Sequence, residues 1–304
     1  MKYVTSCAHG PLRGAALAGL LRRLDSSPAA FAQAARAVPA VSGLASRLPP
    51  RDAKFVALLA LLRDVWAREP GAKVLLFTEA RETLEALREL LRAEGVEALG
   101  YHGDLALVER DRQVARFRDP DGPLLLVCTE VGGEGRNFQF AHHLVHYDLP
   151  WSPATVEQRI GRLDRIGQTH PVDIHVFDVE GTLAADVLAL LADSVGVFGE
   201  TVGGLDAVLE GVESRLLELA LEPPAARARY RDELALAVAE ARAAARRAYD
   251  PLLDVRSFDK EAMEALVTRA RRLRMSLSER LYVSARWDKS ALGSRSRASR
   301  VSSG

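Results

Sequence analysis

Three side chains that can bind phosphate recur at helical spacing near the middle of the chain. Gln158, Arg162 and Arg165 stand at positions i, i+4 and i+7 of the string QRIGRLDRIGQ. On a continuous α-helix they would share one face. Arginine stays charged, and its planar guanidinium matches two phosphate oxygens at once. For arginine pairs at this spacing in general, a solvated helix face with Asp164–arginine pairs would be the favoured interpretation. The whole twelve-residue string from Glu157 to Gln168 instead favours two guanidinium groups aimed at a polyanion, because the specificity of a motif rises with its length.

Two other groups of residues could in principle do chemistry. His142 and His146 would share one face of a strand, with His143 between them, but no further ligand follows at a recognised zinc spacing. Ordinary strand and loop histidines are the favoured interpretation, and no metal site is predicted. Cys128 ends an apolar run and reads as a small core residue, because a nucleophile needs a positioned base.

These residues lie in a region where apolar runs alternate with amphipathic segments. Short runs of 4–8 apolar residues predict buried strands, and longer periodic segments predict helices. The expected strands are 73–77, 96–101, 124–128, 143–147 and 172–179, and the expected helices are 54–67, 81–93, 105–117 and 153–161. Strands that alternate with helices predict an α/β fold with a parallel sheet covered by helices on both faces.

Polar or glycine-rich segments follow four of the predicted strands. They are Thr78-Glu79, His102–Asp104, Thr129–Asn137 and Asp148–Trp151. In open α/β sheets the ligand site lies at the carboxyl ends of the strands. We therefore expect these segments to converge on one functional edge. The glycine spacing in 129–137 is not GxGxxG, so a dinucleotide site is not predicted.

Composition limits the classes of function. The chain has 304 residues with 41 basic and 41 acidic side chains, which excludes a uniformly basic nucleic-acid coat. Its two cysteines are far apart, which excludes a disulfide scaffold and fits a reducing, cytoplasmic setting. No apolar run is long enough to predict a membrane span, so no membrane partner is expected.

The motifs together resemble the second RecA-like lobe of superfamily 2 helicases, in the Swi/Snf form and closest to the bacterial RapA-like group. Gln158–Gln168 resembles motif VI, Thr129–Phe140 motif V and Lys73–Ala80 motif IV. Tyr101–Asp104 with Glu109-Arg110 resembles the motif between IV and V, and His146–Pro153 the linker from V to VI. The resemblance is strong over 54–179 and faint around 252–259.

The resemblance implies a motor of two RecA-like lobes that hold ATP and Mg²⁺ between them and act on double-stranded DNA. Arg162 and Arg165 match the arginine fingers, which neutralise charge on the γ-phosphate. The other matches are Gln158, Glu134 and Gly135 for ATP binding and coupling, and Thr129, Arg136, Asn137 and Trp151 for nucleic acid. For Trp151 the alternative to stacking on nucleic acid is a core position. RNA polymerase is an implied partner through the RapA-like group. Gln168 matches the Swi/Snf ending of motif VI.

The first lobe of such a motor is absent from this sequence. No GxxxxGK[ST] string occurs, and no Asp-Glu pair follows an apolar strand. The lysine that holds the β- and γ-phosphates and the carboxylates that hold Mg²⁺ are therefore missing. We expect the chain alone to have no substantial ATPase activity and to need a Walker-containing first lobe in cis or in trans. The alternative is a non-catalytic nucleic-acid-binding or adaptor module derived from such a lobe.

The expected organisation has four parts: a helical lead-in at 1–52, the helicase C-terminal lobe at 53–195, an α-helical extension at 196–289 and a disordered tail at 290–304. The segment 269–300 is strongly basic. It could bind DNA or RNA through counterion release, or it could be a solvated helix face followed by the tail. The acidic segment 178–240 is expected to contact protein rather than DNA.

Overall fold

The computed structural model describes residues 15–130, 137–165, 168, 170–220, 222–248 and 297–302. Residues up to Val238, with the C-terminal segment that contains 297–302, belong to one compact unit. A second unit spans 239–293, of which only the end of helix α13 is described. The predictions for 252–259 and for most of the basic segment 269–300 lie outside the described residues.

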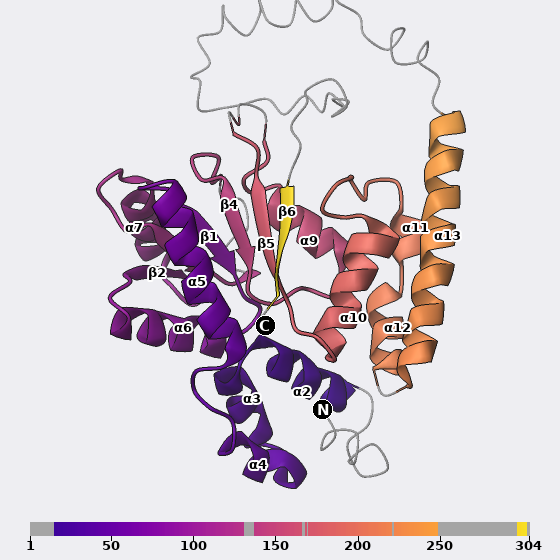
Figure 1. Ribbon diagram of the computed structural model, residues 1–304, viewed down its shortest axis with the longest axis horizontal. Helices are drawn as coiled ribbons and strands as arrows, with labels where there is room; N and C mark the ends of the chain where they lie inside the picture. The colour runs from indigo at the N-terminus through magenta and orange to yellow at the C-terminus, as the bar shows by residue number, and fades with distance from the viewer. Residues whose placement is uncertain are drawn as a thin grey trace, which may run out of the picture. The chain divides into compact units, whose positions relative to one another are not determined.

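A parallel sheet forms the centre of the molecule (Figure 1). Its order is β2-β3-β1-β4-β5-β6, and every neighbouring pair is parallel. The strands are β1 (Val74–Phe77), β2 (Ala98–Tyr101), β3 (Leu125–Cys128), β4 (His143–His146), β5 (Asp173–Asp178) and β6 (Arg297–Ser302). The first four are buried along their whole length, as expected for strands covered on both faces. The predicted RecA-like α/β fold is confirmed.

Helices flank the sheet on either side. They are α5 (Ala53–Arg68), α6 (Arg81–Ala93), α7 (Leu107–Arg118), α9 (Pro153–Ile160), α10 (Leu183–Ala189), α11 (Asp206–Leu209), α12 (Val212–Leu219) and α13 (Pro224–Ala248), with a π-helical turn at Leu190–Val195. Figure 1 shows α5 and α6 on one side of the strands and α9 and α10 on the other. The main hydrophobic core lies between α5, α6 and the sheet.

The local sequence explains where these helices begin and end. The Asp52 carboxylate accepts the N–H of Phe55 at 2.9 Å and caps α5. Ser152 caps α9 in the same way, and Pro153 occupies its first turn. Gly95, with φ of 78°, follows α6 and adopts the left-handed conformation that glycine tolerates. The expected strands and helices are thus present, with ends that differ by a few residues.

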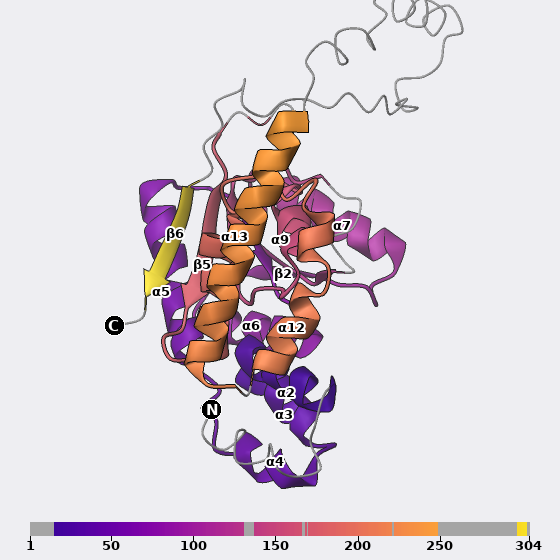
Figure 2. The ribbon, with the colours of Figure 1, turned by 90° about the vertical axis from the view of Figure 1, so that its right-hand side faces the viewer.

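The lead-in consists of α2 (Ala15–Ser26), α3 (Pro28–Ala35) and α4 (Pro39–Ala45). These helices share a small core of their own around Leu20 and Phe31. Figures 1 and 2 both show them below the strands. The strands point downward in these views, so the lead-in lies at the carboxyl edge of the sheet.

The described C-terminal half contains several helices and ends in a strand. Residues 297–302 form strand β6 beside β5, so the prediction of a disordered tail is wrong for those six residues. The physical reason is that β5 offers a free edge, which a short segment can join through backbone hydrogen bonds without a hydrophobic sequence of its own. The helical character predicted after Leu183 is present through Ala248. No described helix is long and apolar enough to cross a membrane.

Candidate nucleotide-facing site

The carboxyl ends of β1 and β4 meet around the side chain of Asp148. One of its oxygens accepts hydrogen bonds from Ser26 at 2.5 Å and Thr78 at 2.6 Å. The other accepts the backbone N–H of Glu79 at 2.8 Å. Asp148 is 7% exposed, and these donors satisfy its buried carboxylate. Ser26 ends α2, so the same carboxylate joins the lead-in to the sheet.

Two carboxyl groups beside Asp148 resist ionisation. Burial, followed by the negative charge of Asp148, raises the pKa of Glu79 to about 7. Burial raises the pKa of Asp25 to about 6, although the Lys54 ammonium opposes the shift. Asp25, Lys54, His146 and Asp148 line a cavity of about 20 Å³, close to the size of one water molecule. Burial at this edge therefore favours the protonated, neutral forms of Glu79 and Asp25.

Arg159 links this edge to the glycine-rich segment. Its side chain is 1% exposed and forms an ion pair with Glu130, which follows β3. One guanidinium nitrogen also donates to the carbonyl of Asp148 at 2.8 Å and lies 3.2 Å from His146 Nδ1. The same guanidinium stacks over Phe77, 5.3 Å from the ring centroid. Arg159 is thus fixed inside the lobe by contacts with three different strand ends.

The two predicted finger arginines lie beyond the end of α9. The helix ends at Ile160, so the expectation that Gln158, Arg162 and Arg165 share one helix face is wrong. Other hydrogen bonds compete with the helix here. The Arg162 carbonyl accepts the N–H of Phe138, in a separate segment, at 3.0 Å, and the Arg165 side chain donates to the carbonyl of Gly161, four residues earlier, at 3.0 Å. The half-buried Arg162 guanidinium has no hydrogen bond or ion pair with any described residue.

The remaining candidate residues differ in the solvent exposure of their side chains. Gln158 is exposed on α9. Thr129 is 7% exposed, and its N–H donates to the Tyr101 carbonyl, so it closes the end of β3. Asn137 is exposed and bonds the N–H and the side chain of Gln139. Glu134, Gly135 and Arg136 lie outside the described residues.

Trp151 does not present its ring for stacking on a base. It is 2% exposed, and the Arg22 guanidinium of the lead-in covers the ring at 4.9 Å from its centroid. Its burial agrees with the core role that the sequence also left open, and a contact of Trp151 with nucleic acid stays a prediction. Its indole packs beneath the lead-in, because a large apolar ring gains more from burial than from solvent.

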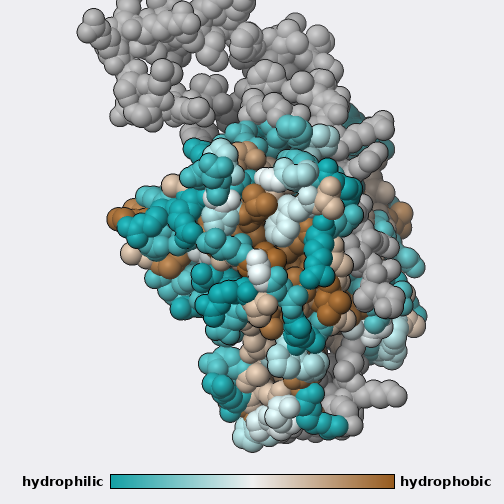
Figure 3. Space-filling model, turned by 60° about the vertical axis from the view of Figure 1, so that its left-hand side comes forward, coloured by the Kyte–Doolittle hydropathy of each residue, from teal (hydrophilic) through white to brown (hydrophobic). Residues whose placement is uncertain are grey.

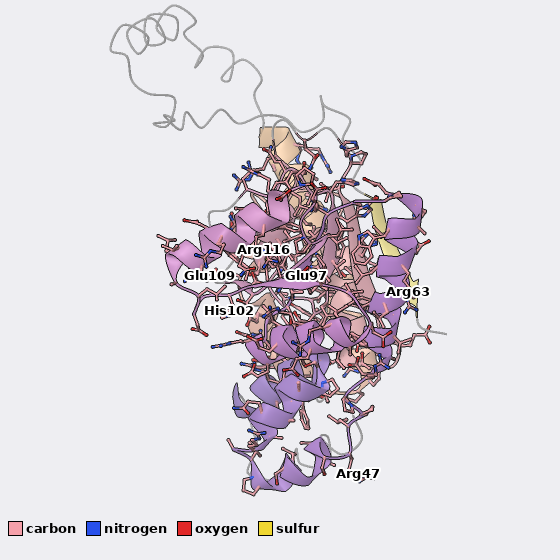
Figure 4. The ribbon with its side chains drawn as sticks, turned by 90° about the vertical axis from the view of Figure 1, so that its left-hand side faces the viewer. Arg47, Arg63, Glu97, His102, Glu109 and Arg116 are labelled. Atoms are coloured by element: carbon pink, nitrogen blue, oxygen red, sulfur yellow. The ribbon has the colours of Figure 1, made fainter. Side chains whose placement is uncertain are left out.

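The segment after β2 is held by its own arginine. Arg110 donates to the carbonyls of Gly103 and Leu105 and so fixes the loop that starts at His102. Burial lowers the pKa of His102, which keeps the imidazole neutral near pH 7. Figure 4 shows His102 and Glu109 on the same side of the lobe, far from Arg63 on α5.

Comparison with known proteins assigns the central region. Residues 53–167 match the family model of the helicase conserved C-terminal domain. We call residues 53–167, which match this model, the helicase lobe. The chain is 40% identical over 151 residues to the RNA polymerase-associated protein RapA of Vibrio parahaemolyticus, an alignment that covers 49% of this chain and 16% of that protein. RapA of Photobacterium profundum is 42% identical over 149 residues, covering 48% and 15%.

Solved structures of helicases give weaker matches. The C-terminal part of the Fun30 ATPase domain aligns with a TM-score of 0.45 and 22% identity, covering 56% of this chain and 54% of that one. Domain 2 of the DEAD-box helicase Mss116p, bound to an RNA duplex, aligns with a TM-score of 0.40 and 23% identity, covering 57% and 66%. The chain spans about one-sixth of the length of its RapA relatives.

Sequence reasoning missed two residues of the helicase lobe that the structure makes prominent. No role was predicted for Arg159, which lies inside the predicted motif VI. Its position next to Gln158 was the signal that could have identified it. Gln168 was left without a role. Its amide nitrogen lies 3.1–3.2 Å from the carbonyls of Gln139, Ala141 and Leu163, so it joins the end of motif V to motif VI.

Proposed function

We propose that this helicase lobe is the second motor lobe of an ATP-dependent translocase on double-stranded DNA, of the Swi/Snf type and RapA-like. The observation that supports it most is that three neighbouring arginines differ in their hydrogen-bond and ion-pair partners. Arg159 is held inside the lobe and Arg165 donates to Gly161, whereas the Arg162 guanidinium has no partner among the described residues. A charged group left half-buried and unpaired suits a partner supplied from outside.

In this proposal ATP and Mg²⁺ are held mainly by a first lobe in cis or in trans. The chain contributes cations but offers neither the glycine-framed lysine nor the carboxylate pair that those groups need. Arg162, assisted by Arg165, would neutralise charge on the γ-phosphate from the opposite side of the cleft. A finger of this kind contributes about 10³–10⁵ in rate in comparable enzymes.

Nucleic-acid contact would come from the segment after β3, with Arg136 and Asn137 as the proposed contacts. Glu134, Gly135 and Gln158 would couple nucleotide to DNA. Glu130 helps to position this segment, because its ion pair with Arg159 joins the start of motif V to motif VI. RNA polymerase is the proposed protein partner, since the RapA relatives are named for that association. The proposed setting is the cytoplasm.

The experiment that tests this function is an ATPase measurement on mixtures. The full chain, the Walker-containing first lobe of a RapA relative, and both together are each assayed with and without duplex DNA. We expect hydrolysis above the sum of the separate rates only when both lobes and DNA are present. A first lobe supplied by the reading frame upstream of this chain, if one encodes the missing motifs, is the matched version of the same test.

Two results would contradict the proposal. Substantial hydrolysis by the chain alone would show that it holds the nucleotide without a first lobe. DNA or polymerase binding by the chain, with no gain in hydrolysis from either first lobe, would favour the non-catalytic adaptor instead.

A further inference from the structure

Glu69 and two histidines converge at the amino edge of the sheet, opposite the Asp148 edge. Glu69 follows α5, His142 precedes β4 and His143 is its first residue. One Glu69 oxygen lies 2.9 Å from His142 Nε2 and 3.4 Å from His143 Nε2. The three potential ligand atoms all lie within 4.8 Å of one another. Residues 69 and 142 are far apart in sequence, so only the fold brings them together.

We propose that Glu69, His142 and His143 bind a divalent transition-metal ion of the Zn²⁺ class. Two histidines and a glutamate form a known three-residue ligand set for zinc, with the fourth position left to water. In a tetrahedral site with bonds of 2.0–2.1 Å, neighbouring ligand atoms are about 3.3 Å apart. The distances from the Glu69 oxygen to the two histidine Nε2 atoms, 2.9 and 3.4 Å, are already close to this value. Only the His142–His143 pair would need to close.

A second layer of contacts orients the inner histidine. His143 Nδ1 lies 3.3 Å from His175 Nε2 and 3.8 Å from a carboxylate oxygen of Asp173. With the metal on Nε2, the Nδ1–H of His143 would point at these acceptors, the arrangement that metal-bound histidines commonly show. The His142 ring stacks on His170 at 5.0 Å between centroids. The cluster thus has both ligands and the support that metal sites need.

The site is open to solvent and separate from the nucleotide-facing edge. The Glu69 side chain is 49% exposed, which leaves a path for the ion. His143 and His146 stand at opposite ends of β4, about 10 Å apart at the usual rise of a strand. His146 belongs to the Arg159 contacts instead. A bound ion would tie the end of α5 to the start of β4 and stabilise the lobe by mass action.

The test uses the full chain without a polyhistidine tag, because a tag would itself bind zinc. After dialysis against micromolar Zn²⁺, bound metal per chain is measured by mass spectrometry, and the melting temperature is recorded with Zn²⁺ and with a chelator. We expect one ion per chain and a higher melting temperature with Zn²⁺. His142→Ala and Glu69→Gln should each weaken binding by at least about tenfold. His102→Asn is the matched control, because it removes a histidine outside the cluster.

Three outcomes would overturn the proposal. One is a chain that takes up no zinc under these conditions. Another is binding that Glu69→Gln and His142→Ala leave intact, which would place the ion elsewhere. The third is a loss of zinc binding in His102→Asn equal to that in His142→Ala and Glu69→Gln. The melting curve in chelator shows whether each variant is folded. If His142→Ala does not fold, Glu69→Gln still tests the proposal, because it is an isosteric change at an exposed side chain. No ATP is used, so failure here is distinguishable from failure of the motor function.

Discussion

Arg159 is the residue on which the carboxyl edge depends most. Its guanidinium contacts the segment after β3 through Glu130 and the segment after β4 through the Asp148 carbonyl. The Arg159 side chain is 1% exposed and the Glu130 side chain is 36% exposed, and the buried Asp148 carboxylate lies 3.9 Å from the guanidinium. Removing one partner of a buried ion pair costs far more than the pair itself contributes.

We predict that Arg159→Ala lowers the free energy of unfolding by about 3–5 kcal/mol, because Glu130 and the Asp148 carbonyl lose their buried donor. Arg159→Lys should recover part of this loss, since it keeps the charge but not the planar fork. Urea denaturation measures both. Arg63→Ala, an exposed arginine paired with Glu94 at 3.4 Å, serves as the control and should change stability by less than about 0.5 kcal/mol. A similar change in Arg159→Ala and Arg63→Ala would contradict the assigned role.

Asp25 gives a prediction about pH. Burial raises its pKa from the ordinary value of 3.8 to about 6, so the folded state binds more protons than the unfolded state between those values. The contribution of Asp25 to stability therefore rises as the pH falls through 6 toward 4 and is least favourable above 6. Asp25→Asn removes this dependence.

Relative to the native protein, Asp25→Asn should thus be more favourable at about pH 8 than at about pH 4.5. Thermal or urea unfolding at both pH values measures the difference. His143, His146 and His175 have lowered pKa values and act in the opposite direction below pH 6.5, but they are present in both proteins and cancel in the comparison. A variant effect that does not change with pH would refute the interpretation.

At the scale of elements, the strands and helices were predictable because each carries its pattern locally. The run KVLLF indicates β1, and the amphipathic period indicates α6. The end of α9 was not predictable in the same way. Gly161 was a weak local signal, but the helix stops where the Arg162 carbonyl pairs with Phe138, a contact between separate segments. Strand β6 was missed because its sequence is polar and its partner is the edge of β5.

Gln168 tests how motif VI is fixed as an element. Its amide nitrogen is shared among three carbonyls, so Gln168→Glu replaces a donor with an acceptor of negative charge. We predict a loss of about 1–3 kcal/mol in the free energy of unfolding, the cost of leaving buried acceptors unsatisfied. Gln33→Glu, at an exposed site on α3, should have little effect in the same urea titration. Equal stability of the two variants would contradict the role of Gln168 in joining these segments by hydrogen bonds.

At the scale of the whole molecule, two features concern contacts between parts: the hydrophobic surface of one face and the packing of the lead-in on the sheet edge. Figure 3 shows hydrophobic residues gathered near the middle of one face within a largely hydrophilic surround. The lead-in covers Trp151 with Arg22, and Ser26 contacts Asp148, so it belongs structurally to the edge that the motifs form. The division at residue 52 stays a prediction about domains, although contacts cross it.

The sequence was sufficient to place the motif segments at one edge, since strands of a parallel sheet share their carboxyl ends. It was insufficient for sites made of residues distant in sequence. The histidine pattern paired His142 with His146 along one strand, whereas the structure pairs His142 with Glu69 and leaves His146 with Arg159. Side-chain partners across elements follow from packing, which spacing within a motif does not encode.

The central claim is that the Arg162 guanidinium serves a nucleotide held by another lobe. The most direct measurement is kcat for DNA-stimulated ATP hydrolysis by the chain together with a first lobe, at saturating ATP, for the native chain, Arg162→Ala and Arg63→Ala. We predict that Arg162→Ala lowers kcat by about 10³-fold or more, and that Arg63→Ala stays close to the native rate. A native kcat in Arg162→Ala would contradict it.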